Sequence, residues 1–233
     1  MKEFRVTEGR FSLRLHYELK EIDQICIDAL REAKALPTDP KAIEIDRFLE
    51  SYWRVPLLYE DLGQDIMGST VFNSMGAVTG FTVARWLDEE GTSRSERRLR
   101  STLAHEGGHG LLHPRLFIAE STPSLFGTDL GHNRPRNFMC RSSDVQPATG
   151  IPKYNGQWWE WQANRAIGSL LLPIPLVRKV VHPFTEPTQF GDILKESHRS
   201  KVVEELAEIF QVNPIVARIR LEETYPQDNH SKL

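Results

Sequence analysis

The segment from Arg94 to His113 constrains the fold of this chain more than any other. Its apolar residues follow a helical period, and Ser93-Arg94-Ser95-Glu96 matches a capping box, in which a hydroxyl and a carboxylate bind the first free backbone amides. Inside this helix stand Gly107 and Gly108, each of which costs about 1 kcal/mol relative to alanine. Gly107 shares a face with Gly110, where the missing side chains let another element approach. We therefore predict a helix with a close packing contact on its glycine face.

The remaining pattern predicts an α+β fold, with a small three-stranded sheet of mixed or antiparallel strands. We expect helices near 17–36, 41–52, 94–113, 158–172, 200–210 and 214–224, and strands near 53–59, 66–72 and 77–84. The last two strands are joined by Asn73-Ser74-Met75-Gly76, where Gly76 can take a positive φ. We predict a single domain over 1–233, with an N-terminal helical extension (1–39), a core (40–175) that contains a long Pro/Gly-rich loop (114–157), and C-terminal helices (176–233).

Composition excludes several classes of protein. The 233 residues carry a formal net charge of −3, which gives no bulk attraction for nucleic acid or anionic membranes. No apolar stretch approaches the roughly 20 residues of a membrane helix, and the first ten residues lack the apolar region of a signal peptide. We expect a cytoplasmic protein. Its two cysteines are too few for a disulfide framework; we expect Cys26 to be a core thiol and Cys140 to be a partly buried loop thiol.

The helix over 94–113 also carries His105-Glu106-Gly107-Gly108-His109, the pattern HExxH. Residues four apart are separated by about 40° around a helix, so both imidazoles can reach one zinc ion. Glu106 lies about 100° from His105 and can lean over the open coordination position without being a ligand. His113 would be about 12 Å along the axis from His105, too far to share the ion, so we expect it beside the ligands or at the surface. The alternative is an ordinary helix with surface histidines.

Glu160 is the candidate for the third protein ligand. On a helix it shares a stripe with Ala163, Asn164, Ile167 and Leu171, which is otherwise small or apolar and therefore faces the core. A buried carboxylate needs a cation or strong hydrogen-bond donors. Asn164 could accept a hydrogen bond from the outer nitrogen of His105 or His109. The alternative is a glutamate stabilised by the helix dipole near an N-terminus.

These two segments resemble the ImmA/IrrE family of metallopeptidases. The resemblance rests on Thr102 to His113, on the pattern E-x-x-A-N-x-x-A-x-x-L-L-x-P from Glu160 to Pro173, and on the glycine-led strand Gly68 to Phe72. It implies a zincin-like fold and a zinc-dependent endopeptidase, with His105, His109 and Glu160 as ligands of Zn²⁺ (Mn²⁺ being possible for the family) and Glu106 as the catalytic residue. It also implies a protein substrate, such as a transcriptional repressor or an antitoxin.

Three further residues are candidates for substrate or transition-state contacts. His132 and Tyr154 lie in the long loop and could stabilise an oxyanion. Arg98 lies on the metal face of its helix and could attract an acidic substrate segment, although a solvated basic face is the simpler interpretation.

Two other functions stay open from the sequence. One is a metal-bound adaptor or toxin-like protein without turnover. The other is a helix-turn-helix DNA-binding regulator, because the segment from Leu206 to Leu221 has suitable spacing. Against DNA binding, residues 195–223 carry 5 Lys and Arg but 6 Glu.

Overall fold

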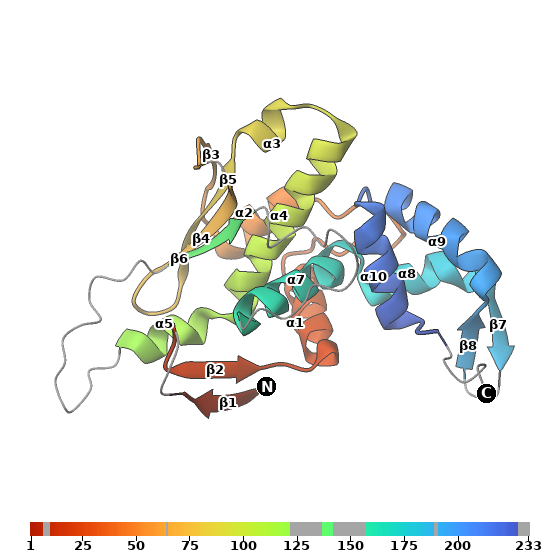
Figure 1. The fold of residues 1–233 in the computed structure, drawn as a ribbon, viewed down its shortest axis with the longest axis horizontal. Coiled ribbons are helices and arrows are strands. Elements are labelled where there is room, and N and C mark those ends of the chain that lie inside the picture. Colours follow the sequence, from red (N-terminus) through yellow and green to blue (C-terminus); the bar gives the residue numbers. More distant parts are fainter. Residues whose placement is uncertain (7–9, 64, 122–136, 142–156, 189–190, 228–233) are drawn as a thin grey trace.

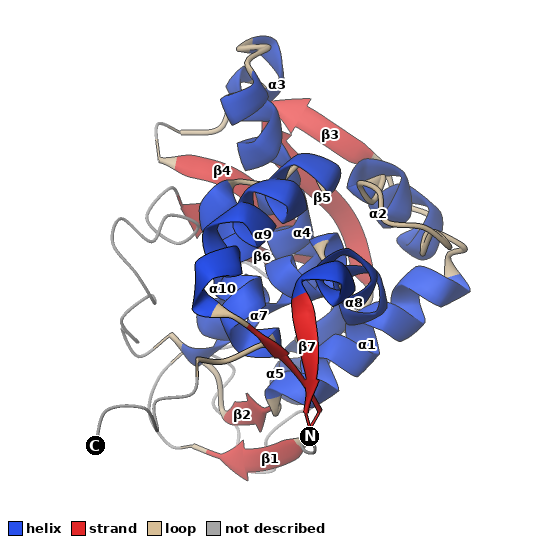
Figure 2. Ribbon diagram, turned by 90° about the vertical axis from the view of Figure 1, so that its right-hand side faces the viewer, coloured by secondary structure: helices blue, strands red, loops and turns tan. Residues whose placement is uncertain are grey.

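The computed structural model describes residues 1–6, 10–63, 65–121, 137–141, 157–188 and 191–227. Helices and strands combine in an α+β architecture, as expected (Figures 1 and 2). The helices are α1 (Leu19–Glu32), α2 (Ile45–Trp53), α3 (Trp86–Glu89), α4 (Ser93–Leu112), α5 (Pro114–Ser121), α7 (Trp158–Leu171), α8 (Ile174–Val181), α9 (Glu196–Ile209) and α10 (Pro214–Thr224). The strands are β1 (Lys2–Arg5), β2 (Leu13–His16), β3 (Leu57–Glu60), β4 (Ile66–Phe72), β5 (Val78–Ala84), β6 (Asn137–Arg141), β7 (Thr185–Thr188) and β8 (Gly191–Leu194).

The central sheet has four strands in the order β3-β5-β4-β6. β3 runs parallel to β5, whereas β4 is antiparallel to both β5 and β6. The three predicted strands are present, but the prediction of a three-stranded sheet was wrong because β6 forms inside the segment expected to be a loop. β6 is short and contains no β-branched residue, so its sequence gives little strand signal. It is a strand because its backbone pairs with β4.

The turn between β4 and β5 forms as predicted. Gly76 has a φ of 74°, and a side chain there would also collide with the backbone of Pro114. The Asn73 side-chain oxygen accepts hydrogen bonds from the backbone amides of Met75 and Ala77, both at 2.9 Å. An asparagine that bonds the following backbone in this way stabilises a tight turn.

α4 begins one residue earlier than the sequence indicated. Thr92 is the N-cap: its hydroxyl accepts from the Ser95 amide at 3.1 Å, and the Ser95 hydroxyl accepts from the Thr92 amide at 3.0 Å. The capping box is therefore formed by Thr92 and Ser95, and the predicted pairing of Ser93 with Glu96 was wrong. Ser95 takes the reciprocal role usually played by a carboxylate or amide.

The glycines of α4 allow close packing, as predicted. A Cβ atom on Gly107 would lie 2.9 Å from the Leu49 side chain, and one on Gly110 would lie 2.7 Å from the Trp53 ring. Both neighbours belong to α2. Gly108 faces a different element, α7, which crosses α4 on the side away from the sheet. α4 thus lies between β4 and α7, and it also packs against α2.

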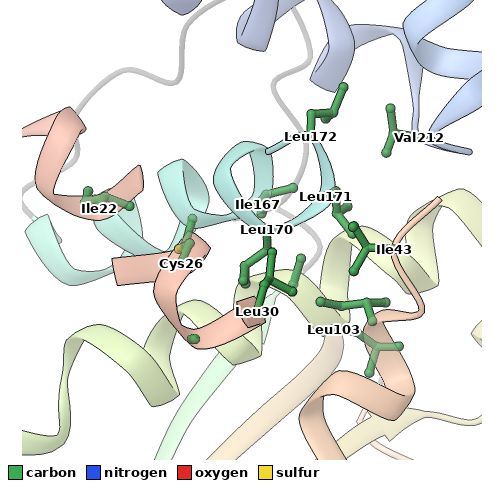
Figure 3. Close-up of a cluster of buried hydrophobic side chains, with 14 of the residues drawn as sticks. Ile22, Cys26, Leu30, Ile43, Leu103, Ile167, Leu170, Leu171, Leu172 and Val212 are labelled. Atoms are coloured by element: carbon green, nitrogen blue, oxygen red, sulfur yellow. The ribbon is translucent and has the colours of Figure 1, made fainter. Parts of the chain in front are cut away.

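The hydrophobic core joins α1, α4, α7 and the C-terminal helices. Figure 3 shows Cys26 beside Ile22 and Leu30 of α1, facing α7. Cys26 is fully buried, so its prediction as a core thiol is confirmed, and burial raises its pKa. α7, which carries Glu160, therefore packs against both α4 and α1.

Several elements of the structure were not predicted from the sequence. The N-terminal extension contains the antiparallel hairpin β1–β2, the segment 114–157 contains α5 and β6, and the C-terminal part contains α8 and the hairpin β7–β8. The predicted helix near 158–172 ends before Pro173, and α8 was not predicted. Pro173 is its N-cap and Pro175 stands in its first turn, where a missing amide hydrogen costs nothing.

Within the described residues, no single helix is long and apolar enough to cross a membrane. Among the described helices, the bent pair Trp158–Leu171 and Ile174–Phe184 passes that test jointly, on length and composition alone. Most of the apolar residues of this pair belong to the hydrophobic core of the fold.

Candidate metal centre

Three potential ligand atoms meet where α4 and α7 cross. His105 Nε2 lies 3.0 Å from His109 Nε2 and 3.1 Å from Glu160 Oε2, and His109 Nε2 lies 3.3 Å from the same oxygen. Both imidazoles are fully buried and Glu160 is 7% exposed. Four ligands placed tetrahedrally at about 2.0–2.1 Å from zinc are separated by about 3.3 Å. The three residues named from the sequence therefore form a buried group that could hold a metal ion.

Gly108 sets the distance between the two helices. A Cβ atom at this position would lie 2.7 Å from the Ala166 Cβ and 3.2 Å from the Ala163 backbone. Such contacts are shorter than van der Waals packing permits, so any side chain would push α7 away. The glycine of the motif, together with the two alanines of α7, thus brings Glu160 within reach of the histidines.

Asn164 fixes the tautomer of His105. His105 Nδ1 lies 3.1 Å from Asn164 Oδ1. Because an amide oxygen only accepts, Nδ1 carries the hydrogen in the neutral ring and Nε2 presents its lone pair to the triad. This is the hydrogen bond that the sequence suggested for Asn164, one helical turn beyond Glu160.

A longer chain of hydrogen bonds fixes the tautomer of His109. The Leu15 carbonyl can only accept, and Gln162 Nε2 donates to it at 2.8 Å. Gln162 Oε1 then accepts from His113 Nε2 at 3.0 Å, so His113 Nδ1 is left as the acceptor. His109 Nδ1, at 3.0 Å from His113 Nδ1, must be the donor. The His109 Nε2 lone pair is consequently directed at the triad.

The pKa shifts agree with neutral His109 and His113. Burial lowers the pKa of His113 to about 3 and that of His109 to about 4. Burial acts to raise the pKa of Glu160, but His109 and His105 hold it well below its usual range. Burial likewise opposes protonation of His105, yet Cys140 and Glu160 raise its pKa well above the usual value. The cluster therefore favours one positive charge at its centre, which a proton or a metal cation can provide.

Glu106 lies beside the triad and is fully buried. The Thr70 hydroxyl of β4 lies 2.5 Å from Glu106 Oε2 and 3.0 Å from its backbone oxygen. A Cβ atom on Gly68 would lie 2.9 Å from Glu106 Oε1, so the glycine that leads this strand makes room for the carboxylate. A Glu106 oxygen, a His105 nitrogen and the Cys140 sulfur lie within 4.8 Å of one another. One water could bridge the carboxylate and the triad at such a distance.

β6 covers the group from the sheet side. The Phe138 ring stacks on the His109 ring at 4.1 Å between centroids, with an angle of 9°. The expectation of a partly buried loop thiol at Cys140 was wrong: Cys140 is a fully buried residue of a strand. Burial raises its pKa to about 11, although the nearby His105 acts to lower it.

The other sequence candidates are not brought to the triad. Arg98 donates to Met67 Sδ at 3.2 Å, and its guanidinium lies 5.2 Å from the centroid of the Trp86 ring. His132 and Tyr154 lie outside the described residues. Conversely, sequence reasoning missed Cys140 and Gln162. Gln162 stands two residues after Glu160, but nothing in the sequence shows that it contacts His113.

Known proteins add no family assignment. No protein-family model matches the chain, and a search of curated proteins found no match. The geometry of the site indicates its chemistry. Two imidazole nitrogens and one carboxylate oxygen suit a divalent cation, and a second carboxylate lies beside them.

Proposed function

We propose that this protein is a metal-dependent endopeptidase with a zincin-like core, of the ImmA/IrrE type that the sequence resembles. The observation that carries the proposal is the joint placement of His105, His109 and Glu160 at ligand spacing, with Glu106 beside them but outside the triad. Catalytic zinc sites commonly use three protein ligands and leave one position open. Two histidines on an exposed helix surface would be neither fully buried nor hydrogen-bonded to other side chains through both Nδ1 atoms.

The chain supplies distinct parts of the proposed hydrolysis. His105, His109 and Glu160 would hold the ion, which when bound supplies Lewis acidity toward a water and a peptide carbonyl. Glu106 takes the proton of the attacking water and returns it to the leaving amine. Thr70 holds the Glu106 carboxylate, and Asn164 and His113 keep both imidazoles in the tautomer that binds metal.

The nature of the substrate follows from the resemblance. We propose a regulatory protein, such as a transcriptional repressor or an antitoxin, cleaved inside its chain. An extended substrate segment could add to a free edge of the central sheet. The edge of β4 next to the site is already paired with β6, so strand addition at β4 requires that β6 be displaced.

Glu106→Gln tests the proposed function. The variant should keep its metal, because Glu106 is not a ligand, and should lose at least about 10²-fold in the rate of cleavage of an unfolded protein substrate. Metal content is measured by mass spectrometry of the purified protein, and cleavage by the appearance of fragments.

Glu96→Gln is the matched control, since it makes the same chemical change on an exposed position of α4. It should leave both measurements unchanged. Undiminished cleavage by Glu106→Gln would exclude the acid–base role, and a metal-loaded protein without any cleavage of its physiological partner would favour the adaptor alternative.

DNA binding by α9 and α10 finds little support in the structure. Two of the basic side chains in this region are buried and paired: Arg199 donates to the Tyr225 carbonyl at 2.6 Å, and Arg220 binds Asp23 at 2.6 Å. Neither is available for phosphate contacts, which supply most of the affinity of DNA-binding helices.

A further inference from the structure

β6, an edge strand of the central sheet, lies beside the candidate metal centre. Phe138 packs against Phe11, Phe72 and Phe117 at centroid distances of 5.4–5.9 Å, in addition to its stacking on His109. The strand is therefore fixed by the aromatic core of the protein. Its second buried side chain, Cys140, follows two residues later and points to the same face of the sheet.

The strand register places the Cys140 sulfur near the ligand atoms. Cys140 pairs directly with Gly68 of β4, and directly paired residues lie on the same face of a sheet. On that face a Cβ atom of Gly68 would meet Thr102 and Glu106 of α4. The missing side chain of Gly68 leaves this face open beside the sulfur. The sulfur accordingly groups with a His105 nitrogen and a Glu106 oxygen within 4.8 Å.

We propose that Cys140 is a fourth protein ligand of the metal ion held by His105, His109 and Glu160. This inference rests on the proposed metal site. The sulfur lies within 4.8 Å of both His105 and Glu106, where a water activated by Glu106 would otherwise bind. In zinc sites the sulfur lies about 2.3 Å from the ion, so it would be about 3.6 Å from each nitrogen ligand. The Cys140 sulfur lies within 4.8 Å of a His105 nitrogen, so the two atoms need to approach each other by about 1.2 Å or less to reach that distance.

Ligation by Cys140 is linked to the release of a proton. When the sulfur–metal bond forms, the thiol proton would leave for solvent and the sulfur would bind as a thiolate.

The fourth ligand has consequences for the metal and for activity. Thiolate ligands favour zinc, whereas manganese prefers oxygen ligands, so a His₂GluCys site selects zinc. A site with four protein ligands has no open position. With Cys140 bound, the metal centre would be closed, and the sulfur would have to leave the ion to free the coordination position that the proposed hydrolysis needs.

X-ray absorption at the zinc edge tests the proposal on the full-length protein loaded with one equivalent of zinc. Wild type should show one sulfur neighbour at about 2.3 Å. The cobalt-substituted protein should show a near-ultraviolet sulfur-to-cobalt charge-transfer band. Cys140→Ser should lose both signals and at least about tenfold in zinc affinity, measured by competition with a chelator.

Cys26→Ala is the control, because it removes the other thiol, which is buried in the core between α1 and α7. It should keep both sulfur signals. Zinc bound by nitrogen and oxygen alone in wild type would overturn ligation by Cys140 and leave the peptidase proposal standing. Failure of the wild-type protein to take up zinc or cobalt would overturn both. The wild-type spectrum decides the question even if Cys140→Ser folds poorly.

Discussion

At the scale of single residues, the candidate site depends on which nitrogen of each histidine carries its hydrogen. The motif supplies two imidazoles on one face of α4, but an imidazole binds metal only through a nitrogen that has no proton. Asn164 accepts from His105 Nδ1, and Gln162 acts on His109 through His113. Side chains of α7 therefore hold His105 and His109 in the tautomers that can bind a cation.

Asn164 should act as a positioning residue for His105. Replacing Asn164 with leucine removes the acceptor of the Nδ1 hydrogen and should lower zinc affinity about 10- to 100-fold, as seen for lost outer hydrogen bonds at metal sites. Asn164→Asp keeps an acceptor at the same place and should retain the affinity. Chelator competition measures both variants. Equal loss in both would mean that Asn164 serves packing and not hydrogen bonding to His105.

At the scale of elements, the site is created by the crossing of α4 and α7. Neither helix can form it alone, because the histidines come from one and the carboxylate from the other. Gly108 stands at the point of closest approach, facing Ala163 and Ala166. The adjacent β4 supplies Thr70 and Gly68, which hold and accommodate Glu106.

Gly108→Ala should separate the two helices. Overpacking costs about 1–3 kcal/mol, which the better helix propensity of alanine, about 1 kcal/mol, offsets only in part. Zinc affinity should fall at the same time, because Glu160 moves away from the histidines. Urea unfolding and chelator competition provide the measurements.

Gly168→Ala is the comparison for this variant, since it makes the same change within α7. The three atoms nearest to its Cβ would all belong to the Arg220 side chain, the first of them at 3.3 Å. It should cost less stability and leave zinc affinity unchanged. A Gly108→Ala protein with unaltered affinity would contradict the role of this glycine in spacing the ligands.

At the scale of the whole molecule, distant parts of the chain hold α7 in place. Arg220 of α10 binds Asp23 of α1 at 2.6 Å and donates to the Leu172 carbonyl at 3.0 Å. Ser169 of α7 donates to the same Asp23 carboxylate at 2.7 Å. The carbonyl of Leu15 in β2 ends the chain of hydrogen bonds from His109. Because these contacts span nearly the whole sequence, metal binding and folding should be coupled.

Zinc should raise the melting temperature of the protein. A ligand that binds only the folded state at 1,000 times its dissociation constant adds about 4 kcal/mol, which corresponds to roughly 8–16 °C for a domain of this size. A chelator should reverse the shift. Calorimetry with and without zinc makes the measurement, and His105→Ala/His109→Ala should show no shift. An equal shift in that double variant would place the bound zinc elsewhere.

Much of the fold and of the site could be predicted from local signals. The helical periods, the HExxH spacing, the Asn73–Gly76 turn and the lone carboxylate on the apolar stripe of α7 are properties of short segments. Each depends on neighbours within a few residues along the chain. The fourth strand of the central sheet gave no such signal, because its pairing partner, β4, is distant in sequence.

The sequence by itself determined which side chains could bind a cation, and on which helices they lie. Only the tertiary structure decided that His105, His109 and Glu160 meet at 3.0–3.3 Å, and that the Cys140 sulfur lies within 4.8 Å of His105 and Glu106. The reason is geometric. Helical spacing fixes relations within about a turn, whereas the approach of α7 to α4 and of β6 to β4 depends on the shapes of all the elements that pack between them.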